Sequence, residues 1–147
     1  MRLKRQTVRV AAPRELTFEV VAAAGKQTGE TDNGVLVEFE TRLGDRVIKT
    51  IEEVQLRPPD SIAYRWLEGP LEGVEEEIRF EQGRAGETVM TYSGSLEGPC
   101  GIVGRLRTML VVRPIFNRLV AEHLEQGKRM AEKRAERSRV HPRPVKG

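Results

Sequence analysis

Hydrophobic and polar residues alternate with a period of two between Val35 and Leu96, as they do in strands that bury one face. Turn-forming residues interrupt the alternation at 43–45, 58–60, 69–70 and 83–86. The strands between these turns are predicted at 35–42, 46–57, 61–68, 72–81 and 87–96. Because the connections are short, the pattern predicts an antiparallel meander with one dry face and one wet face.

The residues before this meander predict a strand and a short helix. Residues 6–11 alternate as in a strand. Pro13 suits the first turn of a helix, which we place at 14–24 because Gly25 is a typical helix end. Residues 26–31 are expected to form a short strand.

The last third of the chain predicts one long helix. From Ile102 onward, apolar residues recur at steps of three and four. Pro114 lies inside this pattern, so we expect a kink or a break between 110 and 113. The apolar stripe ends before the chain does. We therefore place a single domain at 1–138 and an irregular basic tail at 139–147.

This order of elements limits the fold. The sheet must bury its apolar face, and one long helix is available to cover it. A helix about 10 Å wide cannot cover six or seven strands spaced about 4.8 Å apart. We therefore predict an α+β helix-grip fold, in which a curved antiparallel sheet of six or seven strands surrounds the C-terminal helix and leaves a pocket between them.

Three stretches carry a family resemblance. Val8 to Glu15, with Phe18, form a strand followed by an A-P-x-E-x-x-F helix start. Glu52 to Arg65 form a strand, a double-proline turn and another strand, and Thr88 to Tyr92 precede the long helix. Over residues 5–135 the chain resembles the SRPBCC superfamily, which includes START-like, pollen-allergen-like and polyketide cyclase/dehydrase-like proteins. The resemblance implies the same helix-grip fold, which serves binding proteins, transporters and enzymes.

Composition indicates a folded, non-membrane protein. The chain has 147 residues, of which 38% are hydrophobic and 32% charged. Arg105 and Arg107 interrupt its longest apolar run, which is too short to span a bilayer. No apolar stretch follows the basic N-terminus as in a signal peptide. With Cys100 as the only cysteine, no internal disulfide can form, and we expect a cytoplasmic protein.

The net charge of +3 is unevenly distributed. From Lys128 onward eight Lys and Arg accompany two Glu, so this end carries +6 and the rest of the chain −3. Cations suit the C-terminus of a helix, which favours a solvated helix end. The alternative is contact of the basic tail with a membrane surface or, less favoured, with nucleic acid.

Motifs of common catalytic sites are absent from the sequence. There is no G-x-S-x-G, Walker loop, G-x-G-x-x-G or Cys/His metal spacing. Cys100 and His123 would lie about 34 Å apart along a helix, too far for a nucleophile and its base. We therefore expect no metal and no cofactor.

Two glutamates fall on the dry face of the predicted sheet. The period that buries Ile78 and Phe80 also points Glu76 inward, and Glu52 points inward on its own strand. A buried carboxylate must be partnered, protonated or facing a cavity. Glu52 and Glu76 are thus candidate pocket acids with a raised pKa. The alternatives are that the sheet bends and brings them to the rim, or that they pair with arginines such as 105 and 107.

Other residues assigned to the dry face complete the candidate site. On strand 61–68, Tyr64, Trp66 and Glu68 are expected to point inward. The candidate ligand-binding residues are Phe39, Thr50, Glu52, Tyr64, Trp66, Glu76, Ile78, Met90, Tyr92, Met109, Phe116 and Val120. Side chains on the opposite face, such as Glu38, Glu40, Glu75, Glu77, Arg65 and Arg79, are expected to form solvated ion pairs.

Three functions are compatible with this sequence. The first is binding of a small hydrophobic ligand such as a lipid, a polyketide or an isoprenoid. The second is a metal-free cyclase or dehydratase, a lyase or isomerase of the polyketide cyclase/dehydrase kind, with Glu52, Glu76, Tyr64 or Tyr92 as acid and base. The third is an interaction module that uses the basic tail. The sequence also leaves a homodimer open.

Overall fold

A curved antiparallel sheet and one long helix dominate the computed structural model, which describes residues 1–43, 45–69, 72–96, 104 and 107–140. The strands are β1 Gln6–Val10, β2 Lys26–Glu30, β3 Val35–Leu43, β4 Arg46–Arg57, β5 Ser61–Glu68, β6 Glu75–Gln82 and β7 Thr88–Ser95. The helices are α1 Arg14–Ala22 and α3 Arg113–Val140, with a 3-10 turn at Arg84–Gly86 and a π-helical turn at Thr108–Val112.

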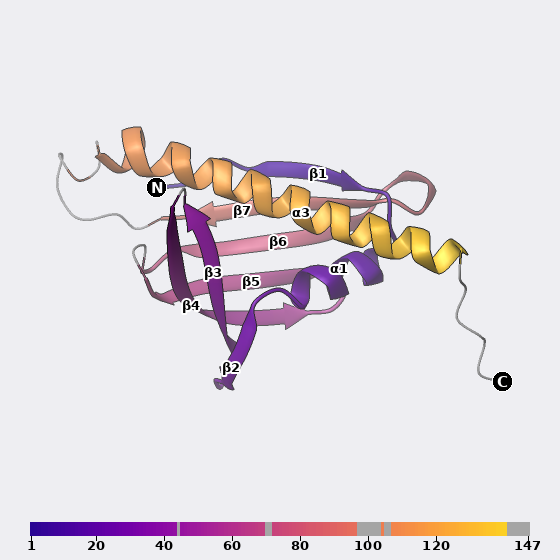
Figure 1. The fold of residues 1–147 in the computed structure, drawn as a ribbon, viewed down its shortest axis with the longest axis horizontal. Helices are drawn as coiled ribbons and strands as arrows, with labels where there is room; N and C mark the ends of the chain where they lie inside the picture. Colours follow the sequence, from indigo (N-terminus) through magenta and orange to yellow (C-terminus); the bar gives the residue numbers. More distant parts are fainter. Residues whose placement is uncertain (44, 70–71, 97–103, 105–106, 141–147) are drawn as a thin grey trace.

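The strands form one sheet in the order β1-β7-β6-β5-β4-β3-β2. The predicted meander is therefore confirmed, and β1 extends it by pairing with β7, with Val8 opposite Met90. Figure 1 shows β3 running crosswise to β5, β6 and β7, so the sheet curves strongly. Helix α3 packs against β1 and α1 at one side of the concave face. This is the predicted helix-grip fold.

The short helix α1 ends earlier than predicted. Its last residue is Ala22, and Ala24 donates to the carbonyl of Val21 in a tighter closing turn. Gly25 follows with a φ of 82°, and a Cβ at this position would lie 2.5 Å from Cγ1 of Val37. The chain leaves the helix here because only glycine fits this close approach to β3.

The N-terminal end of β6 also differs from the prediction. This strand begins at Glu75 and not at residue 72, because Gly73 adopts a φ of 90° and belongs to the turn. The N–H of Gly73 donates to the carbonyl of Trp66, which closes the turn. The region from Arg84 to Gly86, expected as a loop, forms a single 3-10 turn.

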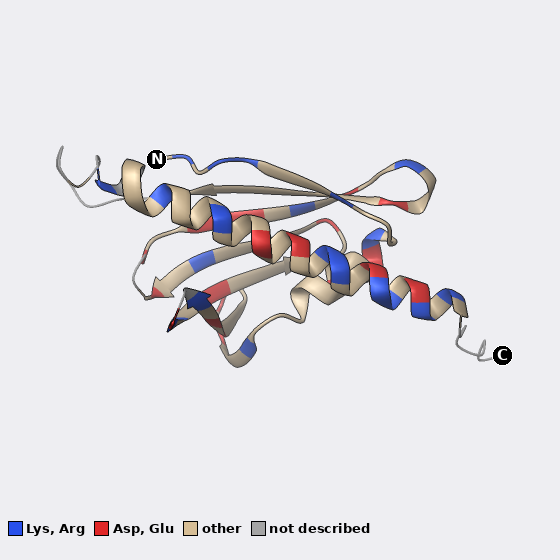
Figure 2. Ribbon diagram, turned by 45° about the horizontal axis from the view of Figure 1, so that its top comes forward, with Lys and Arg blue, Asp and Glu red and all other residues tan. Residues whose placement is uncertain are grey.

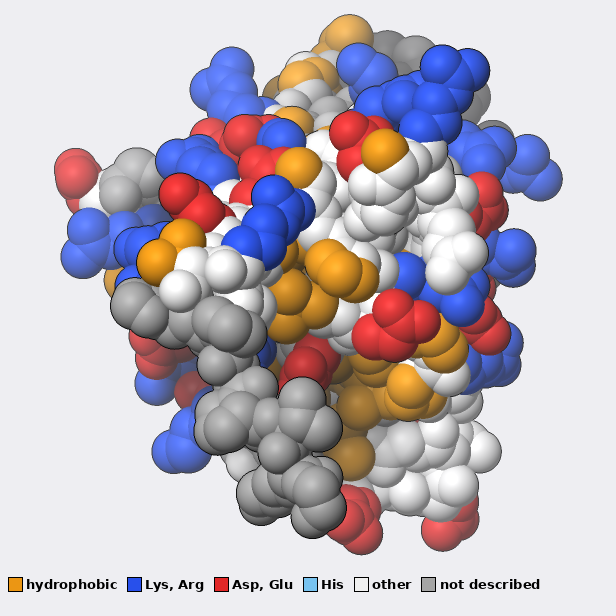
Figure 3. Space-filling model, turned by 90° about the vertical axis from the view of Figure 1, so that its right-hand side faces the viewer, with side chains coloured by type: hydrophobic (Ala, Val, Ile, Leu, Met, Phe, Trp, Pro, Cys, Tyr) orange, Lys and Arg blue, Asp and Glu red, His pale blue; other side chains and the backbone are white. Residues whose placement is uncertain are grey.

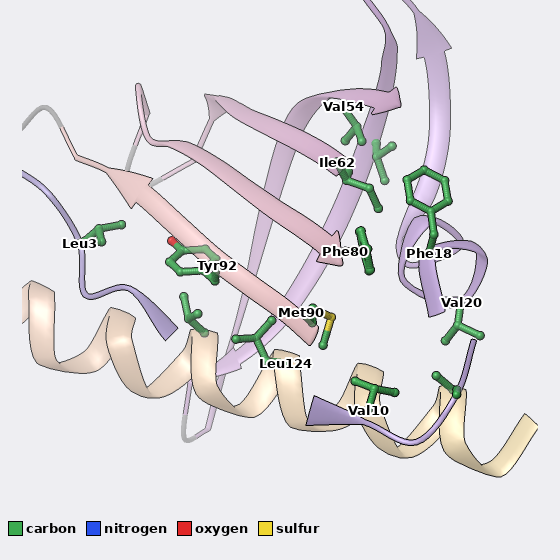
Figure 4. Close-up of a cluster of buried hydrophobic side chains, with 14 of the residues drawn as sticks. Leu3, Val10, Phe18, Val20, Val54, Ile62, Phe80, Met90, Tyr92 and Leu124 are labelled. Carbon is green, nitrogen blue, oxygen red and sulfur yellow. The ribbon is translucent and has the colours of Figure 1, made fainter. Parts of the chain in front are cut away.

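The hydrophobic core lies between the sheet and the two helices. Phe80, Ile62 and Met90 are fully buried. The rings of Phe18 and Phe80 pack edge to face at 5.4 Å. Figure 4 shows Met90 of β7 close to Leu124 of α3. Burial of such side chains supplies most of the stabilisation of a domain of this size.

The long helix is distorted, without being broken, where a kink or a break was predicted. The π-helical turn Thr108–Val112 immediately precedes α3. Pro114 has no N–H to donate to the carbonyl four residues earlier, which accounts for a distortion at this place. Helix α3 continues to Val140, so residues 139 and 140 of the expected tail are helical. Residues 141–147 lie outside the described part of the chain.

Charged side chains cover the outer surfaces. On the convex face of the sheet, Lys49 pairs with Glu38 and Glu40. Two further pairs on this face join Arg65 to Glu53 and Arg79 to Glu77. The expected solvated ion pairs are thus present. Figure 2 shows that Lys and Arg are frequent along α3 and are interspersed with acidic residues. No helix in the described ranges is long and apolar enough to cross a membrane.

Candidate functional site

The register in which adjacent strands pair places most of the candidate residues side by side on the concave face. The directly opposed pairs are Phe39 with Thr50, Glu52 with Trp66, Tyr64 with Glu76, and Ile78 with Tyr92. Opposed residues of antiparallel strands point to the same face. The five strands β3 to β7 therefore carry a continuous band of aromatic and carboxyl side chains.

Glu76 lies at the centre of this band and has both carboxyl oxygens partnered. The indole Nε1 of Trp66 donates to its Oε2 at 2.8 Å, and the hydroxyl of Tyr92 donates to its Oε1 at 2.7 Å. Burial raises the pKa of the Glu76 carboxyl above its usual 4.5, while the hydrogen bonds from Tyr92 and Trp66 act in the opposite direction. The two donors satisfy a carboxyl that would otherwise be costly to bury.

Glu52 is the less solvent-exposed of the two acids, with 6% of its surface exposed. The hydroxyl of Thr50 donates to Oε1 at 3.0 Å, and Oε2 has no hydrogen-bond partner among the described residues. Burial raises the pKa of Glu52 to about 8, assisted by the charge of Glu76 and opposed by the hydrogen bond from Thr50. At pH 7 the Glu52 carboxyl is therefore mostly protonated and can donate as well as accept.

Tyr64 is a second polar group with unused hydrogen-bonding capacity. Its ring packs against Phe39 at 6.1 Å between centroids, and its hydroxyl has no partner among the described residues. Burial, followed by the charges of Glu76 and Glu52, raises the pKa of the Tyr64 phenol. The phenol therefore stays protonated at neutral pH and is available as a donor.

A cavity of about 160 Å³ lies next to Tyr64. Its walls come from Phe39, Val37 and Val54 on the sheet and from residues 22–25 at the end of α1. Figure 3 faces the end of the molecule that carries α1 and shows a recess floored by hydrophobic side chains. The cavity is smaller than most ligand sites, which measure about 300–1,000 Å³. Most of the residues that line it are nevertheless apolar, and Tyr64 is one of them.

A wider depression of about 910 Å³ lies on the convex face of the sheet. It is lined mainly by charged and polar residues, including Arg65, Glu77 and Arg79. Because these side chains already form ion pairs with neighbours, this depression is a solvated surface and not an apolar binding site. The concave face is the better candidate.

Several candidates from the sequence belong to the core. Met90 and Val120 are buried, and Phe116 packs against Trp66 at 5.4 Å between ring centroids. The long helix thus touches the sheet directly at Trp66. The cavity lies nearer α1 than the predicted roof around residues 109–120, and the side chain of Met109 lies outside the described ones.

The predicted inward position of Glu68 is wrong. Strand β5 carries a bulge, because Glu68 pairs with Ile51 whereas Trp66 pairs with Glu52. The extra residue reverses the alternation, and Glu68 is exposed. Glu52 does not reach the rim, and within the described residues, which include Arg107, neither acid forms an ion pair. Arg105 and Cys100 lie outside the described ranges.

Sequence reasoning missed the wall that α1 contributes to the cavity. Ala22, Ala23, Ala24 and Gly25 line it together with Gln27 of β2. A run of four small residues at the end of a helix was the available signal, because small side chains leave space that larger ones would fill. No group of three or more residues able to hold a metal ion occurs in the described part of the chain.

Comparison with known proteins identifies the fold. No protein-family model and no curated protein sequence matches this chain. Among solved structures, the Zhui aromatase/cyclase from Streptomyces sp. R1128 is 21% identical, with a TM-score of 0.67 over 100% of this chain and 98% of that one. A START superfamily protein from Mycobacterium smegmatis is 16% identical, with a TM-score of 0.63 over 93% and 99%.

A protein from Thermus thermophilus is also similar, with 15% identity and a TM-score of 0.73 over 92% of this chain and 99% of that one. The chain therefore has the same helix-grip fold as these solved structures. At these identities the likeness defines the fold and leaves the ligand and any reaction to be argued from the site.

Proposed function

We propose that this chain binds a small, mostly apolar ligand on the concave face of its sheet, such as a lipid, a polyketide or an isoprenoid. The observation that supports this most is Glu52, a deeply buried carboxyl with one oxygen unpartnered among the described residues. This oxygen is not among the enclosed, unpartnered atoms of the described residues, so it stays accessible on the concave face, where the polar group of a ligand can reach it.

Ligand binding is expected to raise the melting temperature. A ligand at 100 times its dissociation constant adds about 2.7 kcal/mol, or roughly 5–10 °C for a chain of this size. The measurement is thermal unfolding with a broad panel of fatty alcohols, sterols, isoprenoids and aromatic polyketides. Ala22→Trp, which fills the cavity, should abolish the shift, whereas Ala121→Trp on the exposed side of α3 should retain it. The absence of a shift across the whole panel would count against the proposal.

A second candidate is an acid–base enzyme of the polyketide cyclase/dehydrase kind. The raised pKa of Glu52, about 8, favours it, because a group that titrates near neutral pH can both give and take a proton. In this case Glu52 would transfer the proton, and Glu76 with Tyr64 would orient the substrate.

The enzymatic candidate predicts a loss of turnover of about 10²–10⁴-fold on an aromatising poly-β-keto substrate in Glu52→Gln. The substrate dissociation constant should change little in the same variant. Turnover that persists with an unchanged pH profile in both Glu52→Gln and Glu76→Gln would exclude this candidate and leave binding as the function.

A further inference from the structure

Aromatic side chains surround the two buried acids. The chain contains seven aromatic residues. Besides Phe80 in the core, four lie on the same face of β3 to β7 as the acids, and a fifth packs on Trp66 from α3. These five are Phe39, Tyr64, Trp66, Tyr92 and Phe116. The faces of aromatic rings carry partial negative charge and attract cations.

Within the described ranges, neither acid of this site forms an ion pair. The ion pairs of Lys and Arg in this part of the chain involve Glu38, Glu40, Glu53, Asp60, Glu77, Glu125 and Glu132. Glu52 and Glu76 instead depend on neutral donors, namely Thr50, Trp66 and Tyr92. A buried acid pair of this kind can carry negative charge but no positive charge.

The unpartnered groups of the site are close neighbours on the sheet. Glu52 pairs with Trp66, and Tyr64 lies two residues from Trp66 on the same face of β5. Residues related diagonally in this way have Cα atoms about 7–8 Å apart. Oε2 of Glu52 and the hydroxyl of Tyr64 can therefore contact one polar group of a ligand between them.

From this arrangement we infer that the concave face takes an apolar ligand bearing a protonated amine. The ammonium group would lie beside Oε2 of Glu52, with the aromatic rings around it and the apolar part in the cavity near Tyr64. This inference rests on the proposed binding function and names its ligand class. An amine supplies the positive charge that the described residues do not, and a carboxylate would add a second negative charge to a site with two acids.

Binding of an ammonium group should also displace the proton of Glu52. The titratable groups that face Glu52 are Glu76 on β6, Tyr64 on β5 and Tyr92 on β7, and the two phenols stay protonated at neutral pH. Helix α3 presents the uncharged Phe116 and Val120 to the core. A cation next to Glu52 favours the carboxylate, so complex formation at pH 7 should release a proton to the buffer.

Three probes with one ring system test the inference: 2-naphthylmethylamine, 2-naphthalenemethanol and 2-naphthoate. Isothermal titration at pH 7, in two buffers of different ionisation enthalpy, gives both the affinity and the number of protons released. The amine is expected to bind at least about tenfold more tightly than the alcohol, because a charged hydrogen bond replaces a neutral one. The carboxylate should bind weakest, and proton release should accompany the amine alone.

Variants separate the acid pair from the cavity. Glu52→Gln should reduce the affinity for the amine to that for the alcohol and abolish proton release. A cooperative urea unfolding transition and an unchanged far-UV circular dichroism spectrum of Glu52→Gln would show that the lost preference for the amine is not a loss of structure. Glu53→Gln, the neighbouring acid on the convex face, should keep the wild-type preference.

Alcohol binding as tight as amine binding, or amine binding without proton release, would overturn the inference and leave the proposed function standing. If none of the three probes binds, and the broad ligand panel also fails, the proposed function itself is contradicted.

Discussion

The free energy of unfolding should fall by about 3–5 kcal/mol as the pH rises from 4.5 to 8, because Glu52 is held protonated in the folded chain. Its pKa is about 8 when folded and 4.5 when the side chain is solvated. Between these values the folded state retains a proton that the unfolded state has released. Raising the pH therefore favours unfolding in this window, and the loss is complete once Glu52 ionises in the folded state. Burial also raises the pKa of Glu76, so this residue contributes to the same loss of stability with rising pH.

Glu52→Gln tests this expectation, because glutamine keeps the shape of the side chain and cannot ionise. Urea unfolding at pH 5, 6, 7, 8 and 9 gives the free energy of unfolding at each pH. In the variant, the decrease of this free energy with rising pH should be at most half of that in the wild type. At pH 9 the variant should be more stable than the wild type by several kcal/mol, because it has no buried carboxylate to ionise; the difference is roughly the stability that the wild type loses as Glu52 ionises. Glu53→Gln, whose side chain lies on the convex face against Arg65, should retain the wild-type slope.

The effect of Glu52 on stability is best measured between pH 6.5 and 8, where the other shifted groups contribute least. Desolvation lowers the pKa of His123, so this residue adds stability as the pH rises toward 6.5 and opposes the glutamates below that value. The pKa of Glu132 is lowered by its hydrogen bond with Lys128 and by the N–H of Ala11, and its contribution is lost only on acidification. A stability that is flat or rising between pH 6.5 and 8 would contradict the assignment of Glu52 as a buried neutral acid.

The second large effect is expected for Phe116→Ala, at about 3–5 kcal/mol of lost stability. Phe116 is 4% exposed and packs its ring against Trp66, where the long helix touches the middle of the sheet. Removing the ring leaves a cavity between α3 and β5 that the rigid neighbours cannot fill completely. Ile115→Ala is the matched control, because Ile115 is 46% exposed on the same turn of α3 and should cost less than about 1 kcal/mol.

Trp66 provides a local measurement of the same contact. It is the only tryptophan of the chain, so the intrinsic emission reports on its surroundings directly. In Phe116→Ala the emission of the folded protein should shift to longer wavelength as water reaches the indole, while Ile115→Ala should leave it unchanged. Equal destabilisation by both substitutions would show that α3 is not held to the sheet through Phe116.

The alternation of residues along the chain was sufficient to predict the sheet. Each strand of the meander could be placed within about three residues, because a period of two combined with proline and glycine turns leaves few alternatives. Pro114 located the distortion before α3 for an equally local reason. The inward direction of Glu52 and Glu76 also followed from the alternation and agrees with the strand register.

The contacts between strands could not be predicted in the same way. Glu76 receives its donors from Trp66 on β5 and Tyr92 on β7, and this depends on the register of three strands at once. The bulge that turns Glu68 outward adds one residue between two regular stretches and leaves no clear mark in the sequence. The position of the cavity beside the end of α1 depends on how that helix packs on β3.

The most direct measurement of ligand binding on the concave face is a crystal structure of the protein with the tightest-binding naphthyl probe. We expect difference density for the ring against Phe39 and Tyr64, with the polar atom of the probe within about 3.2 Å of Oε2 of Glu52. Density for the probe in the convex depression between Arg65 and Glu77, with the concave face empty, would contradict the proposed site.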